Sequence, residues 1–191
     1  MLTISHPTKP VFCPPRGLRH RHVQSLLAAS PLRRGVLRRR ARALLKSARP
    51  EILDCGDGVR LLGLYSPAPA ASRGLAILLH GWEGNADAAY VLSVGARLNA
   101  AGFEVFRLNF RDHGETFALN RELFHSCRID EVVHAVRAAS KAHPSPRTFL
   151  VGHSLGGNFA LRVAVRAPSA GIELAKVVAI CPVLRPQSTM H

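Results

Sequence analysis

The chain has 191 residues, about one ordinary domain; 47% of them are hydrophobic and 20% are charged. This composition excludes a disordered chain, a collagen-like chain and a coiled coil. The sequence has no uncharged apolar run of about 18 residues and no apolar signal core at its N-terminus, so neither a transmembrane helix nor a secretory signal is expected. We therefore expect a cytoplasmic protein, with peripheral membrane association as an alternative.

The net charge of +14 is concentrated at the N-terminal end of the chain. Residues 1–50 contain 12 of the 26 Lys and Arg and no Asp or Glu, whereas residues 51–191 are nearly neutral. We expect a basic, partly helical arm over residues 1–50 and a globular domain over residues 51–191. The four cysteines are scattered without metal-ligand spacing, which predicts free thiols and no metal site.

From residue 51 onward, strand-like and helix-like stretches alternate. The strands are expected at 51–55, 59–65, 75–79, 103–110, 148–151 and 176–184, and the helices at 86–101, within 121–142 and at 155–167. Strand–helix alternation predicts a mostly parallel sheet with helices on both faces. The continuous apolar strands fit burial on both sides of such a sheet.

The most informative motif is Gly-x-Ser-x-Gly, formed by Gly152, Ser154 and Gly156 between an apolar strand and a helical stretch. A strand–turn–helix setting is the one that a nucleophile elbow requires, so we predict that Ser154 is a catalytic nucleophile. Both glycines leave room for a close approach of strand and helix, and the backbone N–H of Leu155 is an oxyanion donor candidate. The alternative is a serine that only caps the helix. His153 is not expected to act as the base, because side chains next to the nucleophile in such a turn point away from it.

A second motif, His80-Gly81-Trp82, follows the strand at 75–79. Acyl transfer needs an oxyanion donor from a second loop, and the backbone N–H of Trp82 is the candidate. Gly81 permits the tight approach, and His80 is expected to order the loop rather than act as a base. The Trp82 side chain could form the floor of a substrate pocket or pack in the core, and both placements stay open.

The order of these motifs identifies a family. Residues 80–82, then 109–114 (NFRDHG), then 152–156 resemble the α/β-hydrolase fold. Residues 14–27 and 119–126 are similar to segments of a narrower group, the YheT-like esterases. The resemblance covers almost the whole chain.

The resemblance implies a sheet of eight strands and a triad in the order Ser, Asp, His. It implies hydrolysis of carboxylic esters, of lipid or short-chain acyl type, through an acyl-enzyme, with no metal or organic cofactor. Here the chain departs from the family, because the 37 residues after Ser154 contain Glu173 as the only acid and His191 as the only histidine. We therefore expect about six of the eight strands, a C-terminally truncated chain, and weak or absent activity.

Two further expectations concern the loop at Asp112-His113 and the edge of the sheet. The Asp112-His113 pair, at the end of the strand at 103–110, is expected to form a capped polar loop, with His113 as a substitute base in the alternative. The exposed edge of a shortened sheet predicts self-association.

The basic arm has three interpretations. Apolar residues recur at helical spacing over residues 32–46 with arginines around them. This stripe could pack on the hydrolase body, or it could lie on an anionic membrane surface as part of a non-catalytic pseudoenzyme or interaction module. Nonspecific nucleic-acid binding is a third possibility, but no aromatic interleaving or recognised motif favours a specific nucleic acid.

Overall fold

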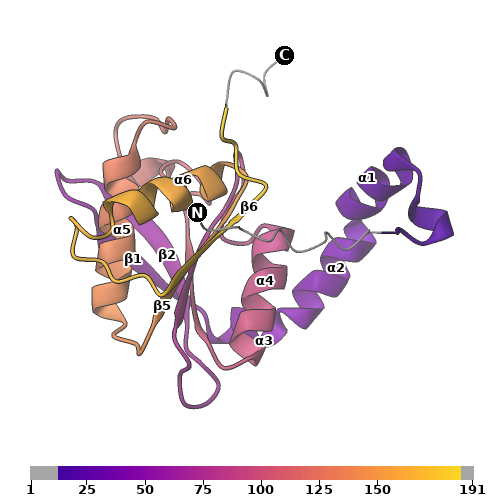
Figure 1. Cartoon of the computed structure of the whole chain (residues 1–191), viewed down its shortest axis with the longest axis horizontal. Helices are drawn as coiled ribbons and strands as arrows, with labels where there is room; N and C mark the ends of the chain where they lie inside the picture. The colour runs from indigo at the N-terminus through magenta and orange to yellow at the C-terminus, as the bar shows by residue number, and fades with distance from the viewer. Residues whose placement is uncertain (1–12, 186–191) are drawn as a thin grey trace, which may run out of the picture. The chain divides into compact units, whose positions relative to one another are not determined.

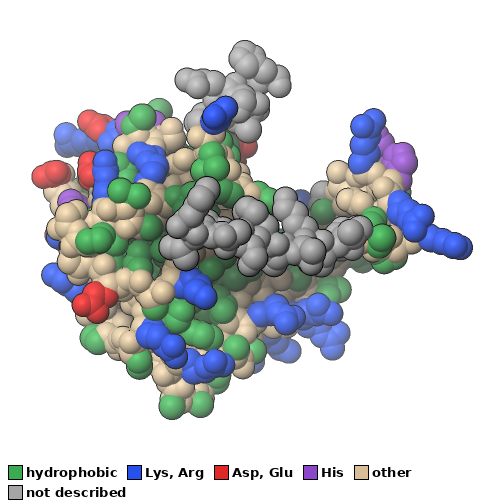
Figure 2. Space-filling view, viewed as in Figure 1, with side chains coloured by type: hydrophobic (Ala, Val, Ile, Leu, Met, Phe, Trp, Pro, Cys, Tyr) green, Lys and Arg blue, Asp and Glu red, His purple; other side chains and the backbone are tan. Residues whose placement is uncertain are grey.

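The computed structural model describes residues 13–185, which fall into two compact units divided after Val36. The first unit contains the short turn η1 (Arg16–Leu18) and helix α1 (Arg21–Ala29), and helix α2 (Pro31–Arg40) crosses the boundary. The described part of this unit, residues 13–36, has Arg and His side chains but no Asp or Glu (Figure 2).

The stripe expected over residues 32–46 is divided in the structure. Helix α2 ends at Arg40 and helix α3 (Arg42–Ser47) follows it. Ala41 and Leu44 are buried in the second unit, whereas Leu32 is 83% exposed. The C-terminal half of the stripe therefore packs on the globular body, while the domain limit at residue 50 stays a prediction.

The second unit is built on a sheet of six strands in the described residues, in the order β1-β2-β4-β3-β5-β6 (Figure 1). The strands are β1 (Arg49–Asp54), β2 (Arg60–Ser66), β3 (Leu75–Leu79), β4 (Glu104–Leu108), β5 (Thr148–His153) and β6 (Lys176–Ile180). Strand β2 pairs antiparallel with β1 and β4, and all the other pairs are parallel. The predicted fold class, a mostly parallel sheet of about six strands, is confirmed.

Helices cover both faces of this sheet (Figure 1). Helices α5 (Ile129–Ala142) and α6 (Leu155–Arg166) lie on one face, and α3 and α4 (Ala89–Ala100) lie on the other. Strand β3 contributes alternate side chains to the two cores: Leu75, Ile77 and Leu79 to the first, Ala76 and Leu78 to the second. No helix within residues 13–185 is long and apolar enough to cross a membrane.

Two elements differ from their predicted limits for backbone reasons. Helix α4 begins at Ala89 instead of residue 86, because Ala88 has an extended conformation with ψ of 138°. Strand β6 ends at Ile180 instead of residue 184, because Cys181 adopts a positive φ of 47°. That bend turns the following segment away from the sheet direction.

Candidate active site at the carboxyl edge of the sheet

The predicted nucleophile, Ser154, lies in a strained turn between β5 and α6. Its φ and ψ of 53° and −115° are a sparsely populated combination for a residue with a side chain. Neighbouring backbone holds it there: the Ser154 N–H donates to the Ile180 carbonyl at 2.8 Å, and its own carbonyl accepts the Asn158 N–H at 3.0 Å. The strain is therefore maintained by the surrounding strand and helix.

Glycines on both sides of Ser154 allow this turn to form. A Cβ at Gly152 would overlap the Gly156 carbonyl, and a Cβ at Gly156 would overlap the backbone of Leu79 and His80. Because all of these atoms belong to backbone, no side chain could move to make room. The first turn of α6 thus packs directly against the end of β3.

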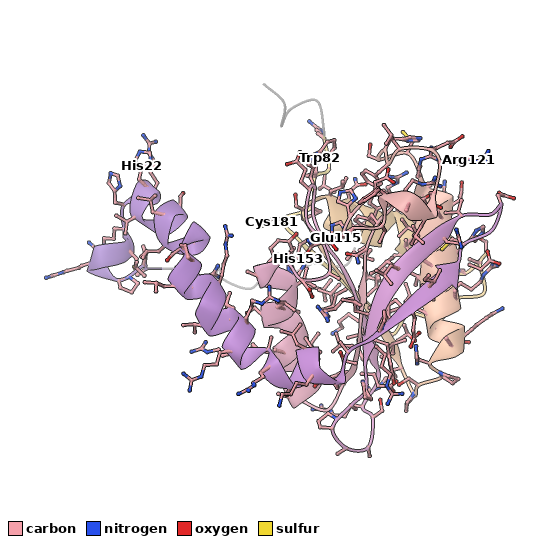
Figure 3. The ribbon with its side chains drawn as sticks, turned by 180° about the vertical axis from the view of Figure 1, so that it is seen from behind. His22, Trp82, Glu115, Arg121, His153 and Cys181 are labelled. Atoms are coloured by element: carbon pink, nitrogen blue, oxygen red, sulfur yellow. The ribbon has the colours of Figure 1, made fainter. Side chains whose placement is uncertain are left out.

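The loop after β3 reaches the same place. A Cβ at Gly81 would lie 3.3 Å from the Ser154 Cβ, so the loop contacts the serine. The backbone N–H groups of Trp82 and Leu155, the two predicted oxyanion donors, have no hydrogen-bond partner within residues 13–185. The Trp82 side chain is 65% exposed at this end of the molecule, so it does not pack in the core of the described residues (Figure 3).

His80 is buried beneath this loop and both of its ring nitrogens are used. Nδ1 is 2.7 Å from the Gly81 carbonyl, and Nε2 accepts the N–H of Phe110 at 3.1 Å. A backbone N–H can only donate, so the ring proton must be on Nδ1, which donates to Gly81. Burial lowers the pKa of His80 from 6.5 to about 4. The side chain is therefore a neutral bridge between two loops and has no nitrogen left to act as a base.

The loop after β4 carries a second histidine near this edge, His113. His113 Nδ1 lies 2.6 Å from the Arg111 carbonyl, and its ring centroid is 4.9 Å from that of His80. Asp112 accepts the N–H of Phe124 at 2.7 Å, so its carboxylate holds the loop, in line with the expected capped polar loop. Within the described part of the chain, His113 Nε2 has no hydrogen-bond partner, and His113 stays the alternative base.

Tyr90, near the start of α4, was not singled out from the sequence. Its hydroxyl accepts the N–H of Gly81 at 2.9 Å, and its ring centroid is 4.9 Å from that of His153. Burial lowers the pKa of His153, whose buried Nδ1 has no partner in the part of the chain that the structure covers. The only sequence signal for Tyr90 is a phenol on the polar side of a helix that directly follows the Gly81 loop.

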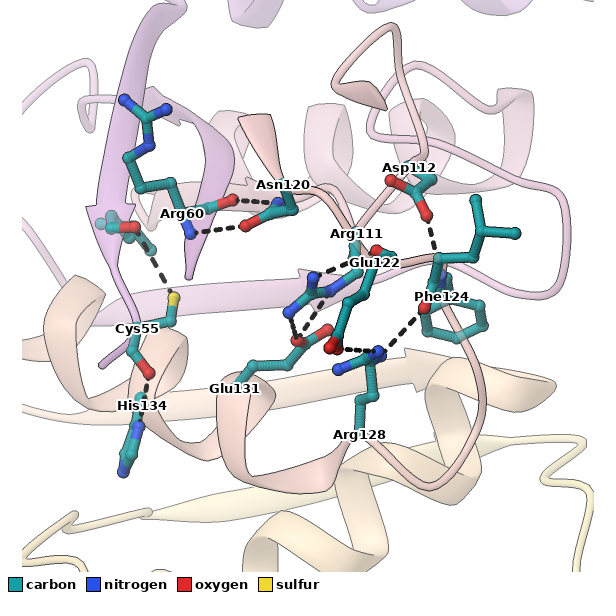
Figure 4. A network of polar contacts seen from close by, with 12 residues as sticks. Cys55, Arg60, Arg111, Asp112, Asn120, Glu122, Phe124, Arg128, Glu131 and His134 are labelled. Carbon is teal, nitrogen blue, oxygen red and sulfur yellow. Dashed lines mark hydrogen bonds and ion pairs between the residues drawn. The ribbon is translucent and has the colours of Figure 1, made fainter. Parts of the chain in front are cut away.

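A second polar network lies at the same sheet edge beside β1 and β2 (Figure 4). Arg111 donates to one carboxylate oxygen of Glu131 from Nε at 3.0 Å and from Nη2 at 2.7 Å, and both side chains are at most 5% exposed. Arg111 also binds the Glu122 carbonyl, and Glu122 pairs with Arg128. A cavity of about 760 Å³ adjoins this network, but none of the predicted site residues lines it. The network anchors the loop at 111–128 to Glu131 of α5.

Metal-binding residues do not gather in the described structure. No group of three His, Cys, Asp or Glu side chains within residues 13–185 is placed to hold an ion. The four cysteines are free, and burial raises the pKa of Cys55 to about 12, so that thiol stays protonated.

Comparison with known proteins defines the family. The family model described as alpha/beta hydrolase fold matches residues 76–191, and the chain belongs to this family. It is 28% identical over 130 residues to a monoacylglycerol lipase of Mycolicibacterium smegmatis, a match that covers 65% of this chain and 45% of the lipase.

Solved structures agree on the fold. The Pyrococcus furiosus esterase Pf2001 is 24% identical with a TM-score of 0.62, covering 74% of this chain and 55% of the esterase. Est1E of Butyrivibrio proteoclasticus, a structure with bound ferulic acid, is 21% identical with a TM-score of 0.60, covering 70% of this chain and 53% of Est1E. The chain thus spans about half the length of these proteins. The narrower YheT-like assignment stays a prediction.

Proposed function

We propose that this chain carries the nucleophile and the oxyanion donors of a serine carboxylic ester hydrolase. The observation that supports this best is the strained turn at Ser154, which lies at the start of α6 beside the Leu155 and Trp82 amides, both without a hydrogen-bond partner within residues 13–185. A nucleophile elbow needs such a turn, and the positive end of a helix favours the developing anion.

The reaction follows from these groups. Ser154 Oγ bonds to the ester carbonyl carbon and gives up its proton to a base. The Leu155 and Trp82 N–H groups receive the oxyanion, and the alcohol leaves with a proton. Water then attacks the acyl-enzyme and releases the acid. The relatives named as a lipase and an esterase support carboxylic esters, of lipid or short-chain acyl type, as the substrate class.

The proposed reaction needs a group that accepts the proton of the Ser154 hydroxyl. Within residues 13–185 no histidine is hydrogen-bonded to the Ser154 hydroxyl. A serine hydroxyl is a poor nucleophile without such a partner. We therefore propose that the 191-residue chain turns over esters slowly or not at all, with His113 as the substitute base in the alternative.

The first prediction tests whether Ser154 is the nucleophile separately from how fast the chain hydrolyses an ester. With p-nitrophenyl acetate, the purified chain should fall several powers of ten short of a complete serine esterase. A fluorophosphonate should nevertheless attach slowly and only to Ser154, forming an Oγ–P bond with loss of fluoride, as read by peptide mass spectrometry. Ser154→Ala should abolish this labelling, whereas Ser169→Ala, an exposed serine on a remote turn, should not change it.

Two results would contradict these expectations. Labelling that persists in Ser154→Ala, or is absent in the wild type, would overturn Ser154 as the nucleophile. Fast turnover that Ser154→Ala removes would instead overturn the expected weak activity. In that case His113→Ala would test the substitute base.

A second candidate function is a non-catalytic module that binds an anionic membrane surface through the exposed part of its basic arm, which leaves out Ala41 and Leu44 of the 32–46 stripe because they are buried. The supporting observation is that apolar side chains of the arm, including Leu26 at 73% and Leu32 at 83%, are exposed among arginines. No acidic residue lies within residues 13–50 to neutralise these arginines. A basic amphipathic helix gains both apolar burial and charge attraction on such a surface.

The membrane prediction is tested by vesicle co-sedimentation. The chain should bind phosphatidylserine-containing vesicles and not pure phosphatidylcholine, and added salt should weaken the binding. Replacing Arg38, Arg39 and Arg40 with Gln should reduce binding roughly 100-fold, at about 1 kcal/mol for each charge near the surface. The matched control replaces Arg137, Lys141 and Arg147 of the globular body with Gln and should have little effect on vesicle binding. Equal binding to the anionic and the neutral vesicles, or binding to neither, would rule out this function.

A further inference from the structure

The Tyr90 hydroxyl lies against the Gly81 loop, close to where that loop contacts the Ser154 turn. It accepts the Gly81 N–H at 2.9 Å. A Cβ at Gly81 would lie 3.5 Å from this hydroxyl and 3.3 Å from the Ser154 Cβ, and a Cβ at Gly84 would overlap the hydroxyl oxygen. The loop therefore closes tightly around the tip of Tyr90 on the side that faces the serine.

Both peptide groups that flank the Gly81 Cα are held by hydrogen bonds. The Gly81 carbonyl accepts from His80 Nδ1 at 2.7 Å and from the Gly84 N–H at 3.0 Å. In a planar trans peptide the carbonyl and the following N–H point in opposite directions. Because the Gly81 carbonyl shares its peptide with the Trp82 N–H, His80 and Gly84 set the direction of that N–H. Tyr90 holds the preceding peptide through the Gly81 N–H.

We propose that Tyr90 is a positioning residue for the Trp82 oxyanion donor, an inference that rests on the proposed serine hydrolase function. The hydroxyl stops the peptide group between His80 and Gly81 from rotating. The ring contacts His153, the residue before the nucleophile, with centroids 4.9 Å apart. One side chain thus couples the loop that carries one oxyanion donor to the turn that carries Ser154. Small misplacements of such groups cost large factors in rate.

The test is Tyr90→Phe, which keeps the ring against His153 and removes only the acceptor for the Gly81 N–H. The chain has a matched control in its other tyrosine, because Tyr65 also makes one hydroxyl hydrogen bond, to Glu104 at 2.6 Å. The rate of fluorophosphonate labelling at Ser154 should fall about tenfold or more in Tyr90→Phe. In Tyr65→Phe it should stay within about twofold of the wild type.

A second measurement does not depend on reactivity. Amide hydrogen exchange at Gly81 should speed up about tenfold in Tyr90→Phe, the effect of losing one hydrogen bond, and should not change in Tyr65→Phe. Faster exchange together with slower labelling supports the proposal.

Three outcomes overturn it. Unchanged exchange means that the hydroxyl does not hold the loop. Faster exchange with wild-type labelling means that Tyr90 is structural only, and in both cases Ser154 as nucleophile stands. Absence of labelling in the wild type, with Ser154→Ala beside it, overturns the proposed function and this inference together.

Discussion

Replacing Gly156 with Ala is expected to cost the protein about 3 kcal/mol or more of unfolding free energy, enough to threaten folding of a domain with ordinary stability. The added Cβ would overlap the carbonyl of His80 and lie 2.6 Å from the carbonyl oxygen of Leu79. These groups end the central strand β3, which is paired on both sides by β4 and β5. They cannot retreat without breaking the sheet, and the better helix propensity of alanine offsets only about 1 kcal/mol.

Urea unfolding followed by circular dichroism measures this effect. Gly95→Ala is the matched control, because Gly95 is also a buried helical glycine but its Cβ would meet only side-chain atoms, the nearest being Leu44 Cδ2 at 3.1 Å. Side-chain ends can shift, so the control should change the midpoint far less. An unchanged midpoint in Gly156→Ala would mean that α6 does not begin against β3 as described.

Acidification should destabilise the fold between pH 6.5 and about 4 through His80. Burial lowers the folded-state pKa of His80 to about 4, whereas the unfolded chain keeps a value near 6.5. The unfolded state therefore binds a proton first as the pH falls. The contribution of the neutral ring is complete above pH 6.5 and is lost on approach to pH 4, an effect of about 3 kcal/mol. A protonated ring would also set Nε2 against the Phe110 N–H, since both would be donors.

Unfolding midpoints measured at several pH values from 7.5 to 4 test this expectation. His80→Ala should be less stable than the wild type at pH 7.5, because it leaves the Phe110 N–H without its acceptor, but its stability should depend less on pH. His125→Ala, which removes an exposed histidine, should keep the wild-type pH profile. Equal pH dependence in wild type and His80→Ala would show that the acid sensitivity arises elsewhere, with His153 the next candidate because burial lowers its pKa too.

Local pattern was a good guide where one element buries one face. Within the helix expected at 121–142, apolar residues recur at helical spacing, and all of them are buried in α5: Ile129, Val132, Val133, Val136 and Ala139. The apolar run at 75–79 is β3 over the same residues and is fully buried. Pattern was a poorer guide in α4: Ala101 continues the apolar spacing of the helix expected at 86–101 but is exposed, while Gly95 and Asn99 are buried. That helix packs through a small residue and a polar one, which hydrophobic spacing does not reveal.

The contacts that organise the candidate site could not be predicted from the sequence. His80 bonds Phe110, Tyr90 bonds Gly81, and Arg111 pairs with Glu131, and each bond except that between Tyr90 and Gly81 joins groups 20 or more positions apart. Such bonds depend on which loops meet at the sheet edge, and that follows from the strand order. The choice of ring proton in His80 likewise depends on a distant backbone N–H.

The amino-acid sequence by itself determined the strand–helix alternation, the parallel sheet and the position of the Gly-x-Ser-x-Gly turn. These follow from residue periodicity and from glycines flanking one serine, which are properties of neighbours along the chain. Only the tertiary structure decided that the Gly81 loop contacts Ser154 and that Tyr90 and His80 hold that loop. It did so because β3, β4 and β5 run parallel and end at one edge, so loops far apart in sequence meet where their strands finish.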